Sequence, residues 1–512
     1  MLWACVSGFY PSRGSFWRCG HRSVQVKNSV RRSIAPAFVV AFVGLTGPIQ
    51  AQETALVLDK VHLLTMSGDG LGESASGRLV VRDGKVVGAG PADSTPIPAG
   101  ATVIDGSGKY VMPGLVDTHS HVGGIGGADN SAPIQPDVRI YDSLNIRDSG
   151  FRRTVAGGLT TINVMPGSGH LLSGQTVYLK MRPAAKIEDM AYHFADGSVM
   201  GGMKMANGTN SIRETPSFPG TRGKSAALVR EQYVKAQEYI AKRARAEKPD
   251  KDGKIDPDKE PARDLAMEGL GDVLSGKRIV QHHTHRADDI LTVLRIAQEF
   301  KYRVVLHHVS EAWKIAAEIA AADTGWSSKG IRGTPCSVIL IDSPGGKLEA
   351  VDCRWETGAV LEKAGVTVAF HTDDWITDSR LFLRSAAFAV RGGMSRAGAL
   401  RAMTINGAKM LDLEKRVGSL EAGKDADFII LSGDPLSVYT KVEQTWVDGK
   451  KVYDRSDPKD RLYATGGYGA GHDQSPYLCC AGGSIFEFGG RVWGSGAATG
   501  AATEAQTQDD SK

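Results

Sequence analysis

Short apolar runs with alternating polar positions occupy two separate stretches of the chain. Residues 55–112 contain three such runs with β-branched residues and Asp-Gly turns, and residues 417–454 repeat the same texture. This alternation, interrupted by turn residues, is typical of half-buried β-strands. The pattern therefore predicts that the two stretches pair into one small composite β-domain, a β-sandwich built from residues 53–113 and 413–455.

Between these flanks, residues 114–412 alternate strand-like and helical runs. Eight strand candidates occur here, and helical periodicity predicts helices at residues 225–246, 287–300, 311–322, 355–364 and 396–412. Repeated βα units indicate a parallel sheet, and eight of them are typical of a (β/α)8 TIM barrel. The predicted fold class is α/β: a TIM barrel that carries the composite β-domain.

The N-terminal segment differs from this body. Residues 33–52 carry no charge, follow a pair of arginines, and hold an apolar stretch that Gly47-Pro48 interrupts. The stretch has the length of a signal-peptide core and is too short to span a bilayer. We expect residues 1–52 to be a signal peptide cleaved near Ala51, giving a periplasmic or secreted protein without stable membrane insertion. An N-terminal membrane anchor is the alternative.

Composition excludes several classes of protein. Of 512 residues, 41% are hydrophobic and 23% are charged, which is ordinary for a globular protein and excludes a polytopic membrane protein. The 61 basic and 57 acidic residues are too balanced for a nucleic-acid partner. Residues 456–512 contain 11 glycines in 57 positions, and we expect them to be an irregular Gly-rich tail. The expected partners are a small-molecule or dipeptide substrate and further copies of the chain in a homo-oligomer.

Histidines gather at the ends of the predicted strands. The motif DTHSH places His119 and His121 two residues apart, so both side chains point the same way. On RIVQHHTH, RVVLHHV and VTVAFHTDD, alternation gives one face to His283, His285, His308, His371 and Asp373, and the other face to His282, His307 and Asp374. The carboxyl ends of barrel strands meet at one mouth. The pattern therefore predicts a metal site for Zn²⁺, with Mn²⁺, Fe²⁺ and Co²⁺ as alternatives.

These motifs resemble a known family. VMPGLVDTHSH, the downstream strand-end His, His and Asp, and the returning segment GSLEAGKDADFIIL are similar to the amidohydrolase superfamily. RADDI after His285, and HTDD on the last strand, resemble its imidazolonepropionase-related branch, which includes secreted metal-dependent dipeptidases. The resemblance covers residues 55–454 and leaves out both ends of the chain.

The resemblance implies a set of metal ligands. They are two first-strand histidines, one histidine each on the fifth and sixth strands, and an eighth-strand aspartate that also shuttles protons: His119, His121, His283, His308 and Asp373. Binuclear members add a carboxylated lysine on the fourth strand. Lys204 is the matching candidate and Lys180 is the rival. If neither is carboxylated, we expect a single metal.

The expected reaction is hydrolysis of a C–N bond in an amide, cyclic amide or dipeptide. A metal-activated hydroxide attacks the carbonyl, and Asp373 moves the proton to the leaving nitrogen. The metal, His285 or His371 stabilises the oxyanion, unless His371 instead orients Asp373. His170 and Gln175, in a Gly/Ser-rich loop, are candidate substrate-binding residues. The alternatives are a deaminase of an amino-substituted ring, a phosphotriester hydrolase on the same metal centre, and a non-catalytic scaffold.

Overall fold

The computed structural model describes residues 54–466, apart from 126, 214, 216, 250, 341–346 and 375, and the backbone of 486–488 and 491–493. The predicted signal peptide and most of the Gly-rich tail lie outside the described residues, so both stay predictions. In the described part of the chain, none of the helices combines the length and apolarity that a membrane span requires.

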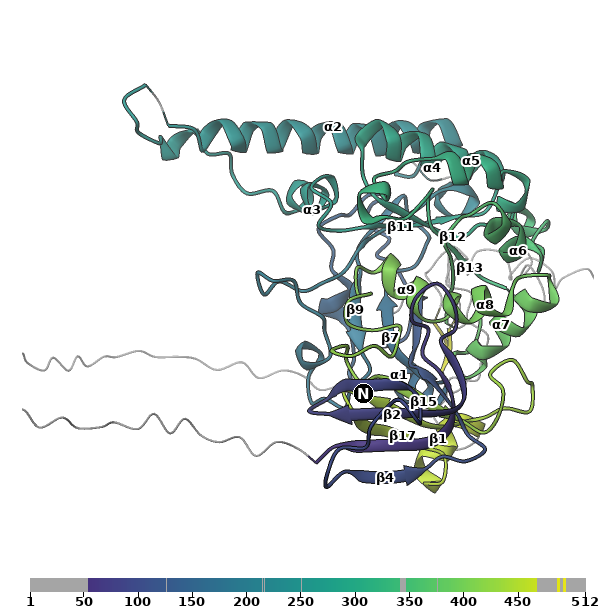
Figure 1. Cartoon of the computed structure of the whole chain (residues 1–512). Coiled ribbons are helices and arrows are strands. Elements are labelled where there is room, and N and C mark those ends of the chain that lie inside the picture. The colour runs from purple at the N-terminus through teal and green to yellow at the C-terminus, as the bar shows by residue number, and fades with distance from the viewer. Residues whose placement is uncertain are drawn as a thin grey trace, which may run out of the picture. The chain divides into compact units, whose positions relative to one another are not determined.

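The two strand-rich flanks meet in one eight-stranded sheet (Figure 1). Its strands are β1 (Leu56–Leu64), β2 (Glu73–Arg82), β3 (Lys85–Pro91), β4 (Thr102–Asp105), β5 (Tyr110–Pro113), β15 (Phe428–Leu431), β16 (Val442–Val447) and β17 (Lys450–Asp454). They follow the order β17-β16-β15-β5-β1-β2-β3, with β4 beside β1, and antiparallel pairing of β5 with β15 joins the two flanks. These described strands form a single sheet, so the second layer of the expected sandwich stays a prediction.

Strand β15 shows why this sheet and the central region belong together. Phe428 and Ile430 are buried in a small core within the composite sheet, whereas Ile429 and Leu431 are buried in the large core of the central region. A strand that is covered on both faces needs apolar residues at every position. The unbroken run FIIL therefore follows from its place between two cores.

The central region is a TIM-barrel-type α/β fold. Its strands are β6 (Leu115–Ser120), β7 (Leu159–Val164), β8 (Leu172–Gln175), β9 (Val177–Lys180), β10 (Met203–Ala206), β11 (Val280–Thr284), β12 (Val304–His308), β13 (Cys336–Val338) and β14 (Val368–Phe370). Strands β10 to β14 are parallel neighbours, as are β6 and β7. A parallel bridge between Ser120 and Asp374 connects the end of β6 to the segment after β14. The carboxyl ends of these parallel strands thus lie together.

The third strand position departs from the predicted parallel repeat. Strands β8 and β9 are separated only by Thr176; β9 runs antiparallel to β7, and β8 runs antiparallel to β10. A parallel return requires a crossover of about a dozen residues or more. The described residues 165–171, which connect β7 to β8, contain no helix. The chain therefore turns back on itself here, and β8–β9 links the two sheets of the barrel.

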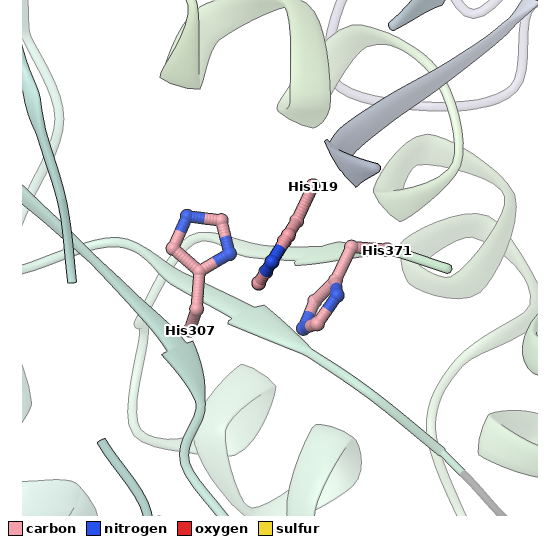
Figure 2. Close-up of side chains that lie close together, drawn as sticks. All are labelled: His119, His307 and His371. Carbon is pink, nitrogen blue, oxygen red and sulfur yellow. The ribbon is translucent and has the colours of Figure 1, made fainter. Parts of the chain in front are cut away.

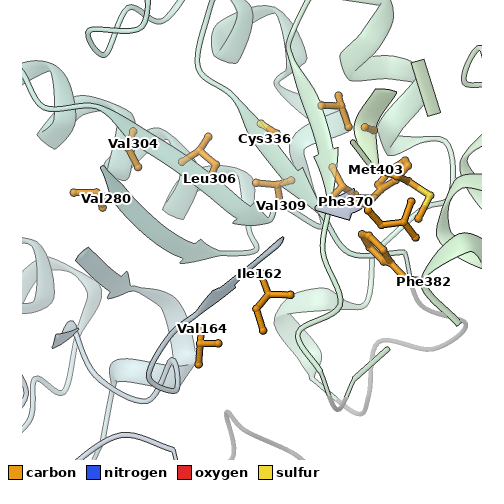
Figure 3. Close-up of a cluster of buried hydrophobic side chains, with 14 of the residues drawn as sticks. Ile162, Val164, Val280, Val304, Leu306, Val309, Cys336, Phe370, Phe382 and Met403 are labelled. Carbon is orange, nitrogen blue, oxygen red and sulfur yellow. The ribbon is translucent and has the colours of Figure 1, made fainter. Parts of the chain in front are cut away.

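The strands pack outward against helices. Val280, Val304, Leu306, Cys336 and Phe370, on β11 to β14, contribute to the large buried core (Figure 3). The helices around it are α1 (Ser149–Ala156), α2 (Arg222–Ala246), α3 (Leu265–Leu274), α4 (Ala287–Phe300), α5 (Ala316–Ala321), α6 (Thr357–Lys363), α7 (Phe382–Arg391), α8 (Arg396–Ala402) and α9 (Ile405–Met410). The helices expected at residues 225–246, 287–300 and 355–364 are confirmed as α2, α4 and α6.

Two predicted helices are interrupted. The segment expected to be helical at residues 311–322 is a short 3-10 turn at Ala312–Lys314 followed by α5. The single helix expected at residues 396–412 is α8 and α9, because Thr404 leaves the helical conformation and its hydroxyl donates to the carbonyl of Leu400 at 2.8 Å. Such bonding of a threonine to the preceding turn competes with helix geometry.

The start of the expected irregular tail is helical, so that part of the prediction is wrong. Helix α10 (Pro458–Thr465) begins with proline in its first turn, and the Asp457 carboxylate accepts from the amide of Lys459 as an N-cap. Proline at this position and an Asp cap both favour helix initiation. Arg152 of α1 forms an ion pair with Asp460 and lies over the ring of Tyr463, which ties α10 to the barrel.

Candidate metal centre

The inner face of the barrel changes from apolar to polar along each strand. Ile279, Val305 and Ala369 form a buried cluster with Trp326 and Met410. Each of these strand faces continues with buried polar side chains two or four residues further along: Gln281, His283, His307 and His371. Since alternate residues of a strand point the same way, an apolar floor inside the barrel leads to a histidine-lined mouth.

The first-strand histidines form the centre of this mouth. The Nε2 atoms of His119 and His121 are 3.1 Å apart. The Nδ1 atom of His121 lies 2.8 Å from the carbonyl oxygen of Met165, which can only accept a hydrogen bond. Nδ1 therefore carries the proton, and the Nε2 lone pair of His121 faces the cluster. In metal-binding histidines, the nitrogen that does not bind the metal typically forms a hydrogen bond that orients the ring.

Asp373 faces the same point from the end of the barrel. Its Oδ1 lies 2.9 Å from Nε2 of His121 and 3.3 Å from Nε2 of His119, and its Oδ2 lies 3.9 Å from Nδ1 of His308. Burial alone would raise the pKa of Asp373, but its contact with His121 and the nearby charge of Lys204 hold it at about 2. The side chain is therefore a carboxylate at neutral pH.

The backbone at Asp373 is left-handed, with φ of +47°. A non-glycine residue keeps this conformation only where its surroundings hold it. Here the amide of Asp373 donates to the carbonyl of His119 at 2.9 Å. The contact connects the last strand segment to the first strand, and it sets the carboxylate beside the first-strand histidines.

Strands β11 and β12 supply a second group of rings. The ring centroids of His283 and His285 are 4.7 Å apart, and His308 lies 4.3 Å from His283 and 5.0 Å from His285. One nitrogen from each of the three rings lies within 4.8 Å of the others. The expected set of His283, His308 and Asp373 is thus brought together with the first-strand pair, and His285 joins it.

The prediction that His307 faces away is wrong. Its ring centroid lies 5.0 Å from that of His119. The reason is that the inner face of β12 carries Val305 and His307, whereas Leu306 packs outward. His308 also reaches the cluster because the alternation ends there, where His308 has φ of +69° and Val309 has φ of +47°. His282 does face away, as expected, and lines a small cavity beside α2 and α4.

The structure separates the two candidate lysines. Lys204 is fully buried, and its Nζ lies 3.2 Å from Nε2 of His119 and 3.2 Å from the sulfur of Met165. The Nζ of Lys180 instead lies 2.5 Å from a carboxylate oxygen of Asp425 and 3.2 Å from one of Asp427. Lys204, not Lys180, is therefore the lysine in the histidine cluster.

The protonation state of the rings suits metal binding. Burial lowers the pKa of His119, His283 and His308 well below the usual value for histidine, and lowers that of His285 and His371 to about 3. Neutral rings offer lone pairs to a metal. Among the described residues, each of these five rings has at least one buried nitrogen without a hydrogen-bond partner. Because such nitrogens are costly to leave unpaired, the donor set fits a divalent ion.

Comparison with known proteins agrees with this geometry. A model of the amidohydrolase family matches residues 357–453. The solved structure of an amidohydrolase from Thermotoga maritima MSB8 is 31% identical, with a TM-score of 0.68, over 78% of this chain and 100% of that chain. The chain belongs to the amidohydrolase family. The predicted superfamily is thereby confirmed, and this amidohydrolase is a hydrolase that acts on C–N bonds.

Two further relatives show how far the similarity extends. An imidazolonepropionase from Sphingopyxis alaskensis is 24% identical over 74% of this chain and 93% of that protein. Amidohydrolase tasK from Hapsidospora irregularis is 26% identical over 70% of this chain, but the match spans only 38% of tasK. Both matches therefore cover most of this amidohydrolase, whereas the match to tasK leaves most of tasK uncovered.

The two candidate substrate-binding residues lie in different places. His170 is buried in the β7–β8 loop of the amidohydrolase, 5.2 Å from the ring of Phe218, and burial lowers its pKa to about 4. Gln175 pairs with Met203 at the start of β10, away from the carboxyl end, and its amide donates to the carbonyl of Pro136 at 3.0 Å. The structure does not bring Gln175 to the cluster.

Three polar contacts that the sequence did not indicate hold the histidines of the amidohydrolase. The amide of Asn210 lies 2.9 Å from Nε2 of His283, and the hydroxyl of Ser310 lies 2.8 Å from Nδ1 of His285. Asp117 accepts from the amides of His119 at 3.1 Å and Thr372 at 3.0 Å, which joins the first and last strands. Asn210 and Ser310 come from segments outside the strands, where alternation gives no information.

Proposed function

We propose that this amidohydrolase hydrolyses amides, cyclic amides or dipeptides at a divalent metal held by His119, His121, His283, His308 and Asp373. The observation that carries the proposal is the position of Asp373, whose Oδ1 lies within 3.3 Å of Nε2 of both first-strand histidines. Nitrogen and carboxylate ligands suit Zn²⁺ best, with Mn²⁺, Fe²⁺ and Co²⁺ as alternatives.

We further propose that Lys204 is carboxylated and bridges two ions. Its Nζ is buried within 3.2 Å of Nε2 of His119, a first-strand ligand. A carboxylated side chain would present oxygen atoms at this point, between the first-strand pair and the histidines of β11 and β12. Without carboxylation, the same residues support one ion.

The reaction follows from these positions. A bound divalent ion supplies an acidified water and polarises the scissile carbonyl. Asp373 accepts the proton as the water oxygen attacks the carbonyl carbon, and it returns the proton to the nitrogen as the C–N bond breaks. His285 faces the same space. If its Nδ1 accepts from Ser310, its Nε2 carries a proton that can be donated to the developing oxyanion. The products are a carboxylic acid and an amine.

We also propose that the enzyme is exported to the periplasm or beyond and acts as a homo-oligomer. The uncharged, apolar segment of residues 33–52 after paired arginines supports export. We extend the proposal to the fold, as a closed eight-stranded barrel whose composite sheet forms one layer of a β-sandwich.

Removal of the metal is expected to abolish the activity. Purified protein is dialysed against a chelator and assayed on dipeptides, N-acyl amino acids and cyclic amides, before and after addition of Zn²⁺, Mn²⁺ or Co²⁺. We expect the loss of activity to be at least ~10²-fold, because the proposed mechanism relies on the metal to acidify the water, and metal addition should restore it.

The same panel of substrates also distinguishes amide hydrolysis from deamination. Amino-substituted rings are included, and release of ammonia from them without cleavage of any amide would favour deamination. Amide hydrolysis that persists in protein with no detectable metal would contradict the proposed function.

A further inference from the structure

We propose that the barrel interior binds an additional metal ion through an inner triad of His119, His307 and His371 (Figure 2). The proposal goes beyond the function above, which uses neither His307 nor His371 as a metal ligand. The triad shares His119 with the rim ligands, which also include His121, His283, His308 and Asp373, and adds His307, which is the β12 partner of His283, and His371. It joins β6 and β12 to the segment that follows β14.

The three rings converge from separate strands. The ring centroids of His119 and His371 are 4.8 Å apart, those of His119 and His307 are 5.0 Å apart, and those of His307 and His371 are 5.3 Å apart. One nitrogen from each ring lies within 4.8 Å of the others. A tetrahedral ion with bonds of about 2.1 Å needs nitrogens roughly 3.4 Å apart, a contraction that small ring rotations supply.

A hydrogen bond prepares His307 as a ligand. Its Nε2 lies 2.7 Å from the side-chain oxygen of Gln281, which can only accept. Nε2 therefore carries the proton, and the lone pair is on Nδ1. That Nδ1 is buried and has no hydrogen-bond partner in the described part of the chain. A ring fixed by a polar group through its other nitrogen is the arrangement found around bound metals.

The other two rings also have nitrogens to offer. Both ring nitrogens of His371 are buried without a hydrogen-bond partner among the residues described, so the ring does not hold Asp373 by a hydrogen bond. His119 uses Nε2 for its contacts with His121 and Lys204, whereas its Nδ1 has no partner within the described residues. Nδ1 of His119 can therefore serve the inner ion; if Nε2 also binds the rim ion, the ring loses its remaining proton to solvent and bridges the two ions as an imidazolate.

The donor set determines the class of ion. Three imidazoles without a carboxylate favour Zn²⁺ or Cu²⁺ over Mn²⁺ or Mg²⁺, which prefer oxygen. An ion held by three strands would stabilise the barrel as well as orient His119 for the rim site.

Metal content tests the proposal. Wild-type protein and the variants His307→Gln and His371→Asn are loaded with Zn²⁺, freed of excess by gel filtration, and analysed for zinc per chain. The matched control is His282→Gln, which removes a buried histidine of β11 that faces the helices. We expect each triad variant to bind one ion fewer than the wild type, and the control to bind as many as the wild type. Equal zinc in the wild type and both triad variants would overturn the proposal.

A spectroscopic measurement distinguishes the inner triad from the rim, whose histidines can also supply three nitrogens. Wild-type protein, His371→Asn and the control His282→Gln, each shown to be folded by circular dichroism, are titrated with Cu²⁺ and followed by electron paramagnetic resonance. We expect one Cu²⁺ signal split by three nitrogens to be present in the wild type and the control and absent from His371→Asn. The same set of signals in all three proteins would overturn the proposal. That outcome would leave amide hydrolysis at the rim intact, so it is distinguishable from failure of the proposed function.

Discussion

Asp373→Asn is expected to lower kcat by at least ~10²-fold on the substrate that the panel identifies, while much of the metal stays bound. The amide has the size of the carboxylate and keeps one oxygen near the two first-strand histidines. It cannot accept the proton of the attacking water, because an amide is not a base at neutral pH. The comparison of kcat with zinc per chain separates loss of the proton shuttle from loss of the metal.

Asp374→Asn is the matched control. The Asp374 carboxylate accepts from the amide of Ser379 at 3.1 Å and belongs to a different hydrogen-bonded group from the cluster. We expect this neighbouring substitution to cost much less in kcat. A wild-type rate for Asp373→Asn, or an equal loss in both variants, would show that the catalytic carboxylate has been misassigned.

Lys180→Met is expected to lower the free energy of unfolding by about 3–5 kcal/mol. Lys180 is fully buried and lies between the carboxylates of Asp425, Asp427 and Asp448. The first two precede β15 of the composite sheet, and Asp448 lies in the turn between β16 and β17. Methionine fills a similar volume but removes the cation that the three carboxylates share. Asp425 keeps Lys85 and Arg416, whereas the buried Asp427 loses its ion-pair partner. The measurement is urea unfolding followed by circular dichroism, with Lys186→Met as the control. Lys186 is exposed and 3.8 Å from Asp189, so its loss should change stability by no more than about 0.5 kcal/mol.

The effect of Lys180→Met should depend on pH. Burial raises the pKa of Asp427 to about 6 even with Lys180 present. An acid whose pKa is raised on folding favours the folded state when protonated, so its cost appears as pH rises through that value. Without the lysine, the carboxylate needs the proton more. We therefore expect a larger deficit at pH 8 than at pH 5, and a deficit independent of pH would contradict this account of the cluster.

The clustering of these histidines could be predicted because their spacing is local. His119 and His121 are two residues apart on one strand, and His283 follows its strand's alternation. His307 was misplaced because the inner face of β12 carries Val305 and not Leu306, and His308 reaches the cluster only through its left-handed backbone. The direction of Asp373 was predicted correctly, although β14 ends at Phe370 and strand alternation does not extend to Asp373. Its orientation depends instead on a hydrogen bond to the first strand.

The remaining features depend on contacts between distant parts of the chain. The alternation in TVYLK is the same whether the strand runs parallel or antiparallel, so the reversal of β9 could not be inferred from it. Lys180 and Lys204 both stand in apolar runs. Their difference depends on carboxylates such as Asp425, far along the chain, which reach one lysine and not the other. Sequence pattern indicates which residues are buried, but not which charges meet.

Anomalous diffraction from crystals of the Zn²⁺-loaded protein tests the central claim most directly. We expect a zinc peak about 2.0–2.2 Å from a ring nitrogen of His119, a ring nitrogen of His121 and a carboxylate oxygen of Asp373. Fully loaded crystals with no zinc at that point, or with zinc bound only elsewhere on the chain, would contradict the assignment of this mouth as the catalytic metal centre.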